Sequence, residues 1–163
     1  MIWIMSELTL RIEKIKEGTV IDHIENGKAF NVLNILGLDG KDGRLITVGI
    51  NVNSKKLKGK KDIIKVEKVF LDNEQLNQIS LISPKCTIAY IRDFKVSKKF
   101  ILNLPDKFIG IFPCNNENCI SNEEREPILS EFLVISEHPT KLKCVYCGRI
   151  LQFEEIASLA RHS

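Results

Sequence analysis

Several features of membrane proteins, secreted proteins and phosphoryl-transfer enzymes are missing from this sequence. Although 44% of its residues are hydrophobic, no apolar run is long enough to span a bilayer. The apolar start, Met1 to Met5, lacks a basic leader and a small-residue cleavage site, so we expect a cytoplasmic protein without membrane association. Neither a P-loop nor a G-x-G-x-x-G motif is present, so a bound nucleotide would be recognised reversibly, without phosphoryl transfer.

Cysteine is scarce, yet four of the five cysteines form a pattern towards the C-terminal end. Cys114 and Cys119 are spaced as C-x4-C, and Cys144 and Cys147 are spaced as C-x2-C. Two such knuckles brought together make a tetrathiolate zinc site, which is closed to water and therefore builds structure without catalysing a reaction. The fifth cysteine, Cys86, begins an apolar run and is expected to be a buried core thiol.

Four cysteines in this pattern have two other interpretations. A pair of disulfides would need an oxidising compartment, whereas a cytoplasmic chain keeps its thiols reduced. An iron–sulfur cluster remains a competitor, because cysteine tetrads also hold such clusters. We therefore expect one structural zinc ion per chain, in a C-terminal module whose role is docking.

Charge is distributed unevenly along the chain, whose net charge is +3. Residues 1–103 contain 18 Lys+Arg and 12 Asp+Glu, whereas residues 104–163 contain 6 and 9. A zinc tetrathiolate would add about −2 to the second part. The acidic second part disfavours nucleic acid as a partner, while the basic first part could hold a small anion. This asymmetry supports two domains, 1–103 and 104–163.

The hydrophobic periodicity of the first part predicts four strands and two helices. Alternation predicts strands at 7–16, 45–52, 62–70 and 87–94, and helical spacing predicts helices at 27–38 and from Asp72 to the residue before Pro84. Gln75 follows Asp72 by three residues, which is typical of a capping box. The order is that of a split βαβ, ferredoxin-like fold with a four-stranded antiparallel sheet, one face of which is partly open to a ligand or a second copy.

The second part is predicted to be smaller and mainly β. Residues 95–107 are polar, contain Pro105 and are expected to be a linker. Strands at 108–112 and 128–135 then alternate with the two knuckles, and a helix follows at 153–161. The expected fold class is α+β: an N-terminal ferredoxin-like βαββαβ antiparallel sheet domain followed by a small, mainly β zinc-ribbon-like domain.

Asp22 and His23 lie in an apolar stretch that we place between the first strand and the first helix. An acid/base dyad is one interpretation. A structural role is favoured over catalysis, because adjacent residues rarely point at one substrate atom and no nucleophile is nearby. A third interpretation fits better: Asp22 accepts a hydrogen bond from a ribose or base while lysines on neighbouring strands hold phosphates.

The candidate phosphate-binding lysines are Lys60, Lys61 and Lys65. The run 55–61 is the most basic in the chain, and such runs usually form a solvated surface, although they also steer anionic ligands. Lys65 differs because it lies in the middle of a predicted strand, from which it projects at a fixed position. A phosphate contact is therefore expected there.

Four segments taken together resemble the regulatory chain of aspartate carbamoyltransferase, an enzyme of pyrimidine biosynthesis. They are GTVIDHI at 18–24, RLITVGIN at 44–51, GKKDIIKVE at 59–67 and CNNENCISN at 114–122. The resemblance implies a non-catalytic chain whose N-terminal domain binds CTP as inhibitor and ATP as activator, with UTP as a further candidate effector. It also implies pairing with a second copy through the sheet, and a zinc domain that docks on the catalytic chain. Regulatory homodimers thereby bridge two catalytic trimers.

The resemblance also implies the site residues. The zinc motif matches Cys114, Cys119, Cys144 and Cys147, and the contacts with the catalytic chain match Asn116, Asn118 and Glu126. The nucleotide motif falls on Ile12, Glu13, Ile15, Val20, Asp22, His23, Ile63, Lys65, Ile91, Val96 and Lys99, with Lys61 close by. In this motif, Asp22 and backbone groups near Ile12 and Ile91 read the base or ribose. Lys99 and His23 lie near the phosphates, and Lys65 reaches the sugar or α-phosphate.

Three positions depart from the family pattern. Ala89 stands where an asparagine is common and Phe94 where a tyrosine is common, both at the base end of the expected pocket. Two possible hydrogen bonds are thereby lost, each worth about 1 kcal/mol net, which affects discrimination between CTP and ATP. Asn115 stands where the family often has a proline, and this exchange loses no backbone donor.

An RNA-binding protein with a ferredoxin-like sheet and a zinc ribbon is the alternative function. RNA-binding sheets of this shape carry exposed aromatic residues on their central strands. Here the middle strands offer Ile, Val and Thr, and the second part is acidic, so the sequence speaks against this alternative.

Overall fold

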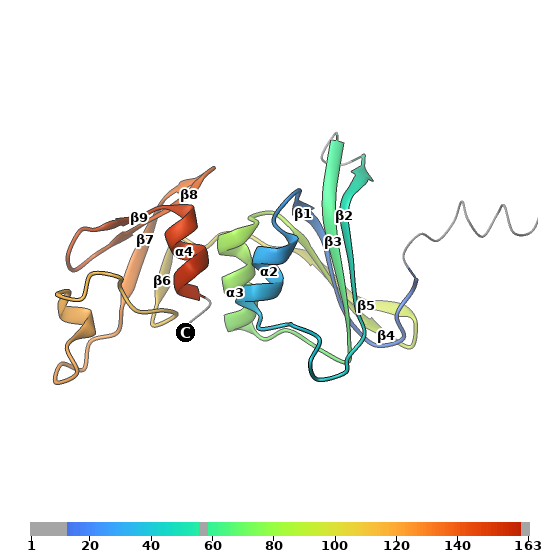
Figure 1. Ribbon diagram of the computed structural model, residues 1–163, viewed down its shortest axis with the longest axis horizontal. Helices are drawn as coiled ribbons and strands as arrows, with labels where there is room; N and C mark the ends of the chain where they lie inside the picture. Colours follow the sequence, from blue (N-terminus) through green and yellow to red (C-terminus); the bar gives the residue numbers. More distant parts are fainter. Residues whose placement is uncertain (1–12, 56–58, 161–163) are drawn as a thin grey trace, which may run out of the picture. The chain divides into compact units, whose positions relative to one another are not determined.

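The computed structural model describes residues 13–55 and 59–160. Its helices and strands follow one another as labelled in Figure 1: β1 (Gly18–Glu25), α2 (Ala29–Ile35), β2 (Ile46–Ser54), β3 (Gly59–Glu67), α3 (Asn73–Ile82), β4 (Thr87–Arg92), β5 (Lys95–Ile101), β6 (Lys107–Ile109), a 3-10 turn (Ile120–Asn122), β7 (Glu131–Glu137), β8 (Thr140–Cys144), β9 (Ile150–Leu151) and α4 (Phe153–Ala160). No helix among these residues is both long and apolar enough to cross a membrane.

The chain separates into two compact units that alternate along the sequence. The first comprises residues up to Ala29, Gly40–Phe70 and Thr87–Ile101, and contains one sheet, here sheet A. The second comprises Phe30–Asp39, Leu71–Cys86 and Leu102–Ser163, and contains sheet B. The mixed α+β class predicted from the sequence is confirmed.

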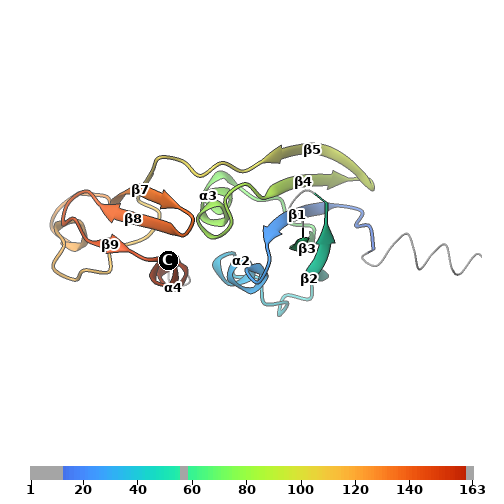
Figure 2. The same ribbon diagram turned by 90° about the horizontal axis from the view of Figure 1, so that it is seen from above.

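Sheet A is antiparallel, with the strand order β2-β3-β1-β4-β5 (Figure 2). Its central strand β1 pairs with β3 and β4, as the split βαβ arrangement requires. Ile21 on β1 lies opposite Ile64 on β3 and Ile88 on β4, and all three are fully buried. Directly opposed residues share one face of a sheet, so these isoleucines mark its core face.

Strand β1 begins near residue 16, the predicted end of the first strand. Of the predicted strand at 7–16, residues 7–12 lie outside the described residues, and residues 13–16 form no strand. Strand β1 instead starts at Gly18, at a φ of +143°, and a Cβ at this glycine would lie 2.0 Å from the carbonyl oxygen of Val66 on β3. The glycine therefore permits close approach of two strand backbones.

The predicted linker at 95–107 is wrong for its first half, because Lys95–Ile101 forms β5 and pairs with β4. Asp93 and Phe94 make the two-residue turn between them, both at positive φ. Such turns usually contain glycine or asparagine, so the sequence carries no hairpin signal here. The strand looks polar because it lies at the edge of the sheet, with most of its residues exposed.

In the second unit, sheet B has the order β6-β7-β8-β9 and is antiparallel. Its core contains Phe132 of β7, Leu142 of β8 and Ile156 of α4, each at most 1% exposed, and the rings of Phe112 and Phe132 stack 4.9 Å apart. Leu81 of α3 belongs to the same cluster. Strands β8 and β9 were not predicted, since both are short and the second knuckle connects them.

Helix α3 begins as the sequence predicts. The Asp72 side chain accepts a hydrogen bond from the Gln75 backbone amide at 2.8 Å, and the Gln75 side chain accepts one from the Asp72 amide at 3.0 Å. This reciprocal pair is a capping box, which satisfies two donors at the helix start. The helix ends at Ile82, before Pro84.

Candidate functional site

The four knuckle cysteines converge on one point. The Sγ atoms of Cys114, Cys119, Cys144 and Cys147 all lie within 4.8 Å of one another. Two sulfur pairs, Cys114–Cys147 and Cys119–Cys144, are each 3.7 Å apart. With Zn–S bonds of about 2.3 Å, a regular tetrahedron places its sulfur atoms about 3.8 Å apart. The tetrad therefore has the donor set and dimensions of a site for one structural zinc ion.

Local hydrogen bonds shape each knuckle. In the first, the Asn122 amide donates to the carbonyl oxygens of Cys114 and Asn116, both at 2.8 Å, and so closes the loop between the cysteines. In the second, Gly148 adopts a φ of +76° and its N–H donates to the Cys144 carbonyl at 2.9 Å. A left-handed residue at this point is easiest for glycine, which explains the C-x2-C-G pattern.

The thiols respond differently to their surroundings. Burial raises the pKa of Cys114 to about 12 and also raises the pKa of Cys144. Burial acts upwards on Cys147 too, but hydrogen bonds, led by one from the Arg149 backbone amide, lower the pKa of Cys147 to about 7. Among the described residues, no cysteine forms a disulfide. Because metal ligation requires thiolates, binding of the ion must displace protons from the buried pair.

A second constellation lies on the side of sheet A that we call the lysine face. Lys65 of β3 lies opposite Val20 of β1, Val20 opposite Ala89 of β4, and Ala89 opposite Lys99 of β5. These four side chains form one row across the sheet. Neighbouring strands lie about 4.8 Å apart, so the two lysines are rooted about 14 Å apart with two small apolar residues between them.

The apolar part of the lysine face is a small cluster of its own. Ile15, Ala89 and Ile91 are at most 9% exposed and pack together, with Val20 against them. Ile91 lies opposite Val96, so this second predicted site residue of β5, besides Lys99, lies on the same face. The structure thus unites predicted residues from 15 to 99 that the sequence separates widely. Ile63 lies two residues before Lys65 on β3, so the two side chains lie on the same face of the sheet.

Asp22 and His23 both belong to β1, so placing them between a strand and a helix was wrong. The register of β1 against β3 shifts between Ile21 and Ile24, and His23 sits in this bulge at a φ of +56°. Bulges re-aim side chains, and here two consecutive residues contact one another's polar groups. The Nδ1 atom of His23 lies 3.9 Å from Asp22 Oδ2 and 3.2 Å from the Thr87 hydroxyl. Adjacent side chains of a regular strand point to opposite faces, whereas in this bulge Asp22 and His23 lie close to each other.

Lys61 and Lys65, on the lysine face, have partners within the chain. Lys61 Nζ lies 2.8 Å from Asp22 Oδ1, and Lys65 Nζ donates to the Glu13 carbonyl at 2.9 Å. Burial lowers the pKa of Lys65 below the ordinary lysine value; Asp22 opposes this shift and Lys14 adds to it. Ile12, another predicted residue, lies outside the described residues.

Two family matches together cover most of the chain. Residues 10–103 match the family described as "Aspartate carbamoyltransferase regulatory chain, allosteric domain", and residues 106–157 match "Aspartate carbamoyltransferase regulatory chain, metal binding domain". The chain belongs to the aspartate carbamoyltransferase regulatory chain family. The lysine face falls within the allosteric match and the tetrad within the metal-binding match, so the resemblance seen in the sequence is confirmed.

Three relatives, each named aspartate carbamoyltransferase regulatory chain, illustrate the similarity. The protein of Ignicoccus hospitalis is 48% identical over 91% of this chain and 95% of its own length. That of Thermoplasma volcanium is 47% identical over 93% and 99%, and that of Thermofilum pendens 51% identical over 90% and 92%. Nothing in these matches supports the RNA-binding alternative.

The residues predicted to contact a catalytic chain lie on and after the first knuckle. Asn118 and Glu126 help to line a hollow of about 400 Å³. The other residues that line it are Glu117, Cys119, Ile120, Asn122 and Glu123. Asn116 accepts a hydrogen bond from the Asn118 backbone amide at 3.1 Å. The loop geometry is thereby fixed next to the metal ligands.

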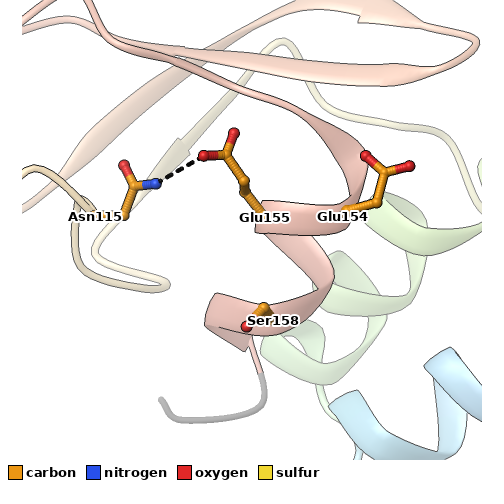
Figure 3. A pocket seen from close by; sticks show the side chains of 4 residues that line it. All are labelled: Asn115, Glu154, Glu155 and Ser158. Atoms are coloured by element: carbon orange, nitrogen blue, oxygen red, sulfur yellow. Dashed lines mark hydrogen bonds between the residues drawn. The ribbon is translucent and has the colours of Figure 1, made fainter.

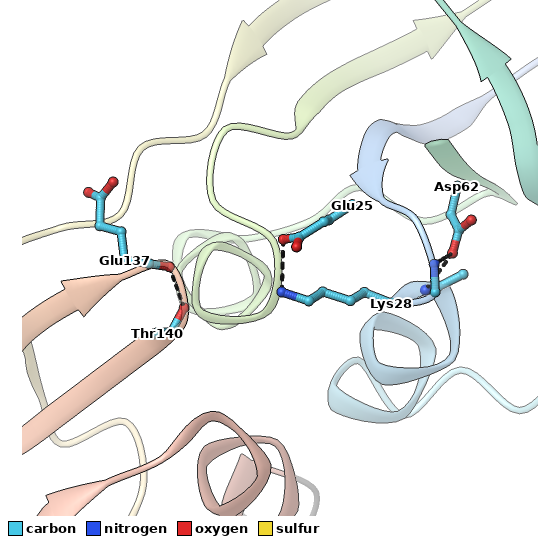
Figure 4. Close-up of polar contacts among 7 residues, drawn as sticks. Glu25, Lys28, Asp62, Glu137 and Thr140 are labelled. Atoms are coloured by element: carbon cyan, nitrogen blue, oxygen red, sulfur yellow. Dashed lines mark hydrogen bonds and ion pairs between the residues drawn. The ribbon is translucent and has the colours of Figure 1, made fainter. Parts of the chain in front are cut away.

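Asp62 is a structurally important residue that sequence reasoning missed. Its side chain, labelled in Figure 4, is fully buried. Its oxygens accept hydrogen bonds from the backbone amides of Gly27, Ala29 and Asn51 at 2.9, 3.1 and 3.0 Å. From β3, on which it directly follows Lys61, Asp62 joins the start of α2 to the bulge of β2. The available signal was an acidic residue at an inward position of an alternating strand.

Proposed function

We propose that the chain is a non-catalytic, allosteric regulatory subunit of a cytoplasmic aspartate carbamoyltransferase in pyrimidine biosynthesis. Its domain 1–103 binds CTP and ATP, with UTP as a further effector, and its domain 104–163 docks on the catalytic chain. The matched families and the names of the relatives support this proposal. Regulatory homodimers would bridge catalytic trimers.

The lysine face carries the nucleotide part of the proposal. Ammonium groups at both ends of the row Lys65-Val20-Ala89-Lys99 suit a polyphosphate, and the apolar residues between them suit a ribose or base. Asp22 and His23 add an acceptor and a further polar group beside the row. Glu13, Ile15, Lys61, Ile63, Ile91 and Val96 complete the proposed pocket.

Residues 104–163, which we call the metal module, support the docking part of the proposal. Asn116 and Asn118 lie between two zinc ligands, and Glu126 follows on the same hollow. The ion would hold Cys114 and Cys119 together with the second knuckle, and would thereby fix the surface that these residues present. The closed tetrathiolate supplies structure to this surface and no reaction.

Regulation follows from differential affinity. An effector that binds one quaternary state more tightly than the other shifts the equilibrium towards that state. A coupling free energy of about 1–3 kcal/mol corresponds to a several-fold or larger change in affinity between the sites. The same linkage requires that catalytic-site ligands change effector affinity reciprocally.

Calorimetry on the isolated chain tests the nucleotide part. Lys99→Ala should weaken CTP and ATP binding about tenfold, since a charge-assisted hydrogen bond contributes about 1.5–3 kcal/mol. Lys98→Ala is the matched control, because Lys98 lies opposite Tyr90 and faces away from the row. No heat with either nucleotide at millimolar concentration would refute the nucleotide site.

Co-expression with a catalytic chain tests the docking part. We expect a complex whose mass fits regulatory dimers bridging catalytic trimers, and a catalytic rate that changes with CTP. The isolated regulatory chain should show no carbamoyltransferase turnover. Turnover by the chain alone would overturn the non-catalytic role, whatever the calorimetry shows.

A further inference from the structure

Glu155 joins three parts of the metal module. Its Oε2 accepts a hydrogen bond from the Gln152 backbone amide at 2.9 Å, at the start of α4. Its Oε1 accepts one from the Asn115 side-chain amide at 3.3 Å, drawn in Figure 3, and lies 3.7 Å from Nη2 of Arg149. One carboxylate therefore contacts a helix start and a residue beside each knuckle.

Both contacted residues are coupled to metal ligands. Asn115 directly follows Cys114 in the first knuckle. Arg149 lies two residues beyond Cys147, and its carbonyl accepts a hydrogen bond from the Cys144 amide at 2.9 Å. A movement of either residue would therefore move a cysteine that binds the ion.

Helix α4 provides a fixed base for this carboxylate. Ile156, the next residue, is fully buried in the core of the metal module. Asn115, Glu154, Glu155 and Ser158 line a cavity of about 370 Å³ (Figure 3). The Asn115 Oδ1 atom is buried and has no hydrogen-bond partner among the described residues, so the one polar contact of that side chain is to Glu155.

We propose that Glu155 is a positioning residue for the metal site, which clamps both knuckles to α4 and slows release of the ion. Release requires the knuckles to separate, because each supplies two of the four sulfur ligands. A carboxylate bonded beside both knuckles opposes that separation. Partners in the outer shell of a metal site commonly change metal affinity by 10–100-fold.

Zinc release from the full-length, zinc-loaded chain tests this proposal, with a chromogenic chelator as the readout. We expect Glu155→Ala to release zinc about tenfold faster than the unmodified chain. Asn115→Ala should accelerate release about threefold, since it removes one contact and leaves the Gln152 bond of α4 in place. Glu155→Gln should release zinc at a rate between those of the unmodified chain and Glu155→Ala, because glutamine has one acceptor oxygen where the carboxylate uses two, Oε2 for Gln152 and Oε1 for Asn115.

Glu154→Ala is the matched control, with the same loss of charge on the neighbouring residue of the same helix, and should change the release rate less than twofold. Circular dichroism monitors the helix content of every variant. Release at the unmodified rate from both Glu155→Ala and Asn115→Ala would overturn the proposal. Fast release from Glu155→Ala alone would also overturn it, since the effect would then come from capping of α4. The assay needs neither nucleotide nor catalytic chain, so its outcome is independent of the proposed regulation.

Discussion

The metal tetrad and the lysine face are assembled in opposite ways. The tetrad joins two short loops, in each of which the two cysteines are close in sequence. The lysine face takes one residue from each of four strands, between Val20 and Lys99, and depends on their register. A chelating loop is specified by local spacing, whereas a row across a sheet exists only after long-range pairing.

The two sites also differ in what they contribute to the fold. Three of the four cysteines are buried in the core cluster of their module, so the ion and the core depend on one another. On the lysine face, Lys61 already has Asp22 as a partner and Lys65 the Glu13 carbonyl, so we expect this face to keep its structure without a ligand. Removal of a ligand should therefore unfold the first site and leave the second intact.

Loss of a metal ligand should give the largest effect. Cys144→Ser removes a fully buried ligand, and structural zinc contributes about 10–16 kcal/mol to folding in small zinc modules. We expect loss of zinc, loss of protease resistance in the second unit and loss of association with the catalytic chain. Cys86→Ala, which removes a buried thiol outside the tetrad, should retain one zinc per chain by atomic absorption. Retained association in Cys144→Ser would show that the ion does not form the docking surface.

Replacement of Asp62 tests the stability of the first unit separately from the zinc site. Asp62→Ala leaves one buried and two part-buried backbone N–H groups without their acceptor, which should lower the free energy of unfolding by about 3 kcal/mol. Chemical denaturation followed by circular dichroism measures this change. The exposed Asp42→Ala control should change stability by less than about 0.5 kcal/mol. A zinc content that fell with Asp62→Ala would contradict the independence of the two sites.

A smaller effect is expected at Ala89, which lies between Val20 and Lys99 on the lysine face. Ala89→Asn adds an amide able to read a base edge, and one net hydrogen bond of about 1 kcal/mol corresponds to about fivefold. We expect the ratio of CTP to ATP affinity to shift about fivefold in calorimetric titrations. An equal change for both nucleotides would remove Ala89 from the base end of the pocket.

The smallest effect concerns pH. Burial lowers the pKa of Lys65, so this lysine loses its positive charge at a lower pH than an exposed lysine does. Nucleotide affinity should therefore decline as pH rises from neutral into the alkaline range. Lys65→Arg keeps its positive charge over this pH range, so its nucleotide affinity should decline less. We expect the two proteins to differ severalfold at most in affinity at alkaline pH, as measured by titrations at several pH values. An unchanged pH profile in Lys65→Arg would show that Lys65 does not contact the phosphates.

Local patterns predicted the parts of the molecule whose geometry is local. The capping box of Asp72 and Gln75 and the pairing of the two knuckles are both confirmed. The errors arose where a residue acts across strands. The first strand was predicted at 7–16, although β1 starts at Gly18, which lets β3 approach closely. The residues of β5 were predicted to be part of a linker because an edge strand is polar.

By itself, the sequence determined the donor set of the metal site, the α+β order of elements and the family. Spacing, periodicity and motif order are all properties of neighbouring residues. Only the tertiary structure decided that Lys65, Val20, Ala89 and Lys99 share one row, that a bulge brings His23 beside Asp22, and that Glu155 contacts both knuckles. These relations depend on strand register, bulge geometry and helix packing, which arise from contacts between residues far apart in the chain.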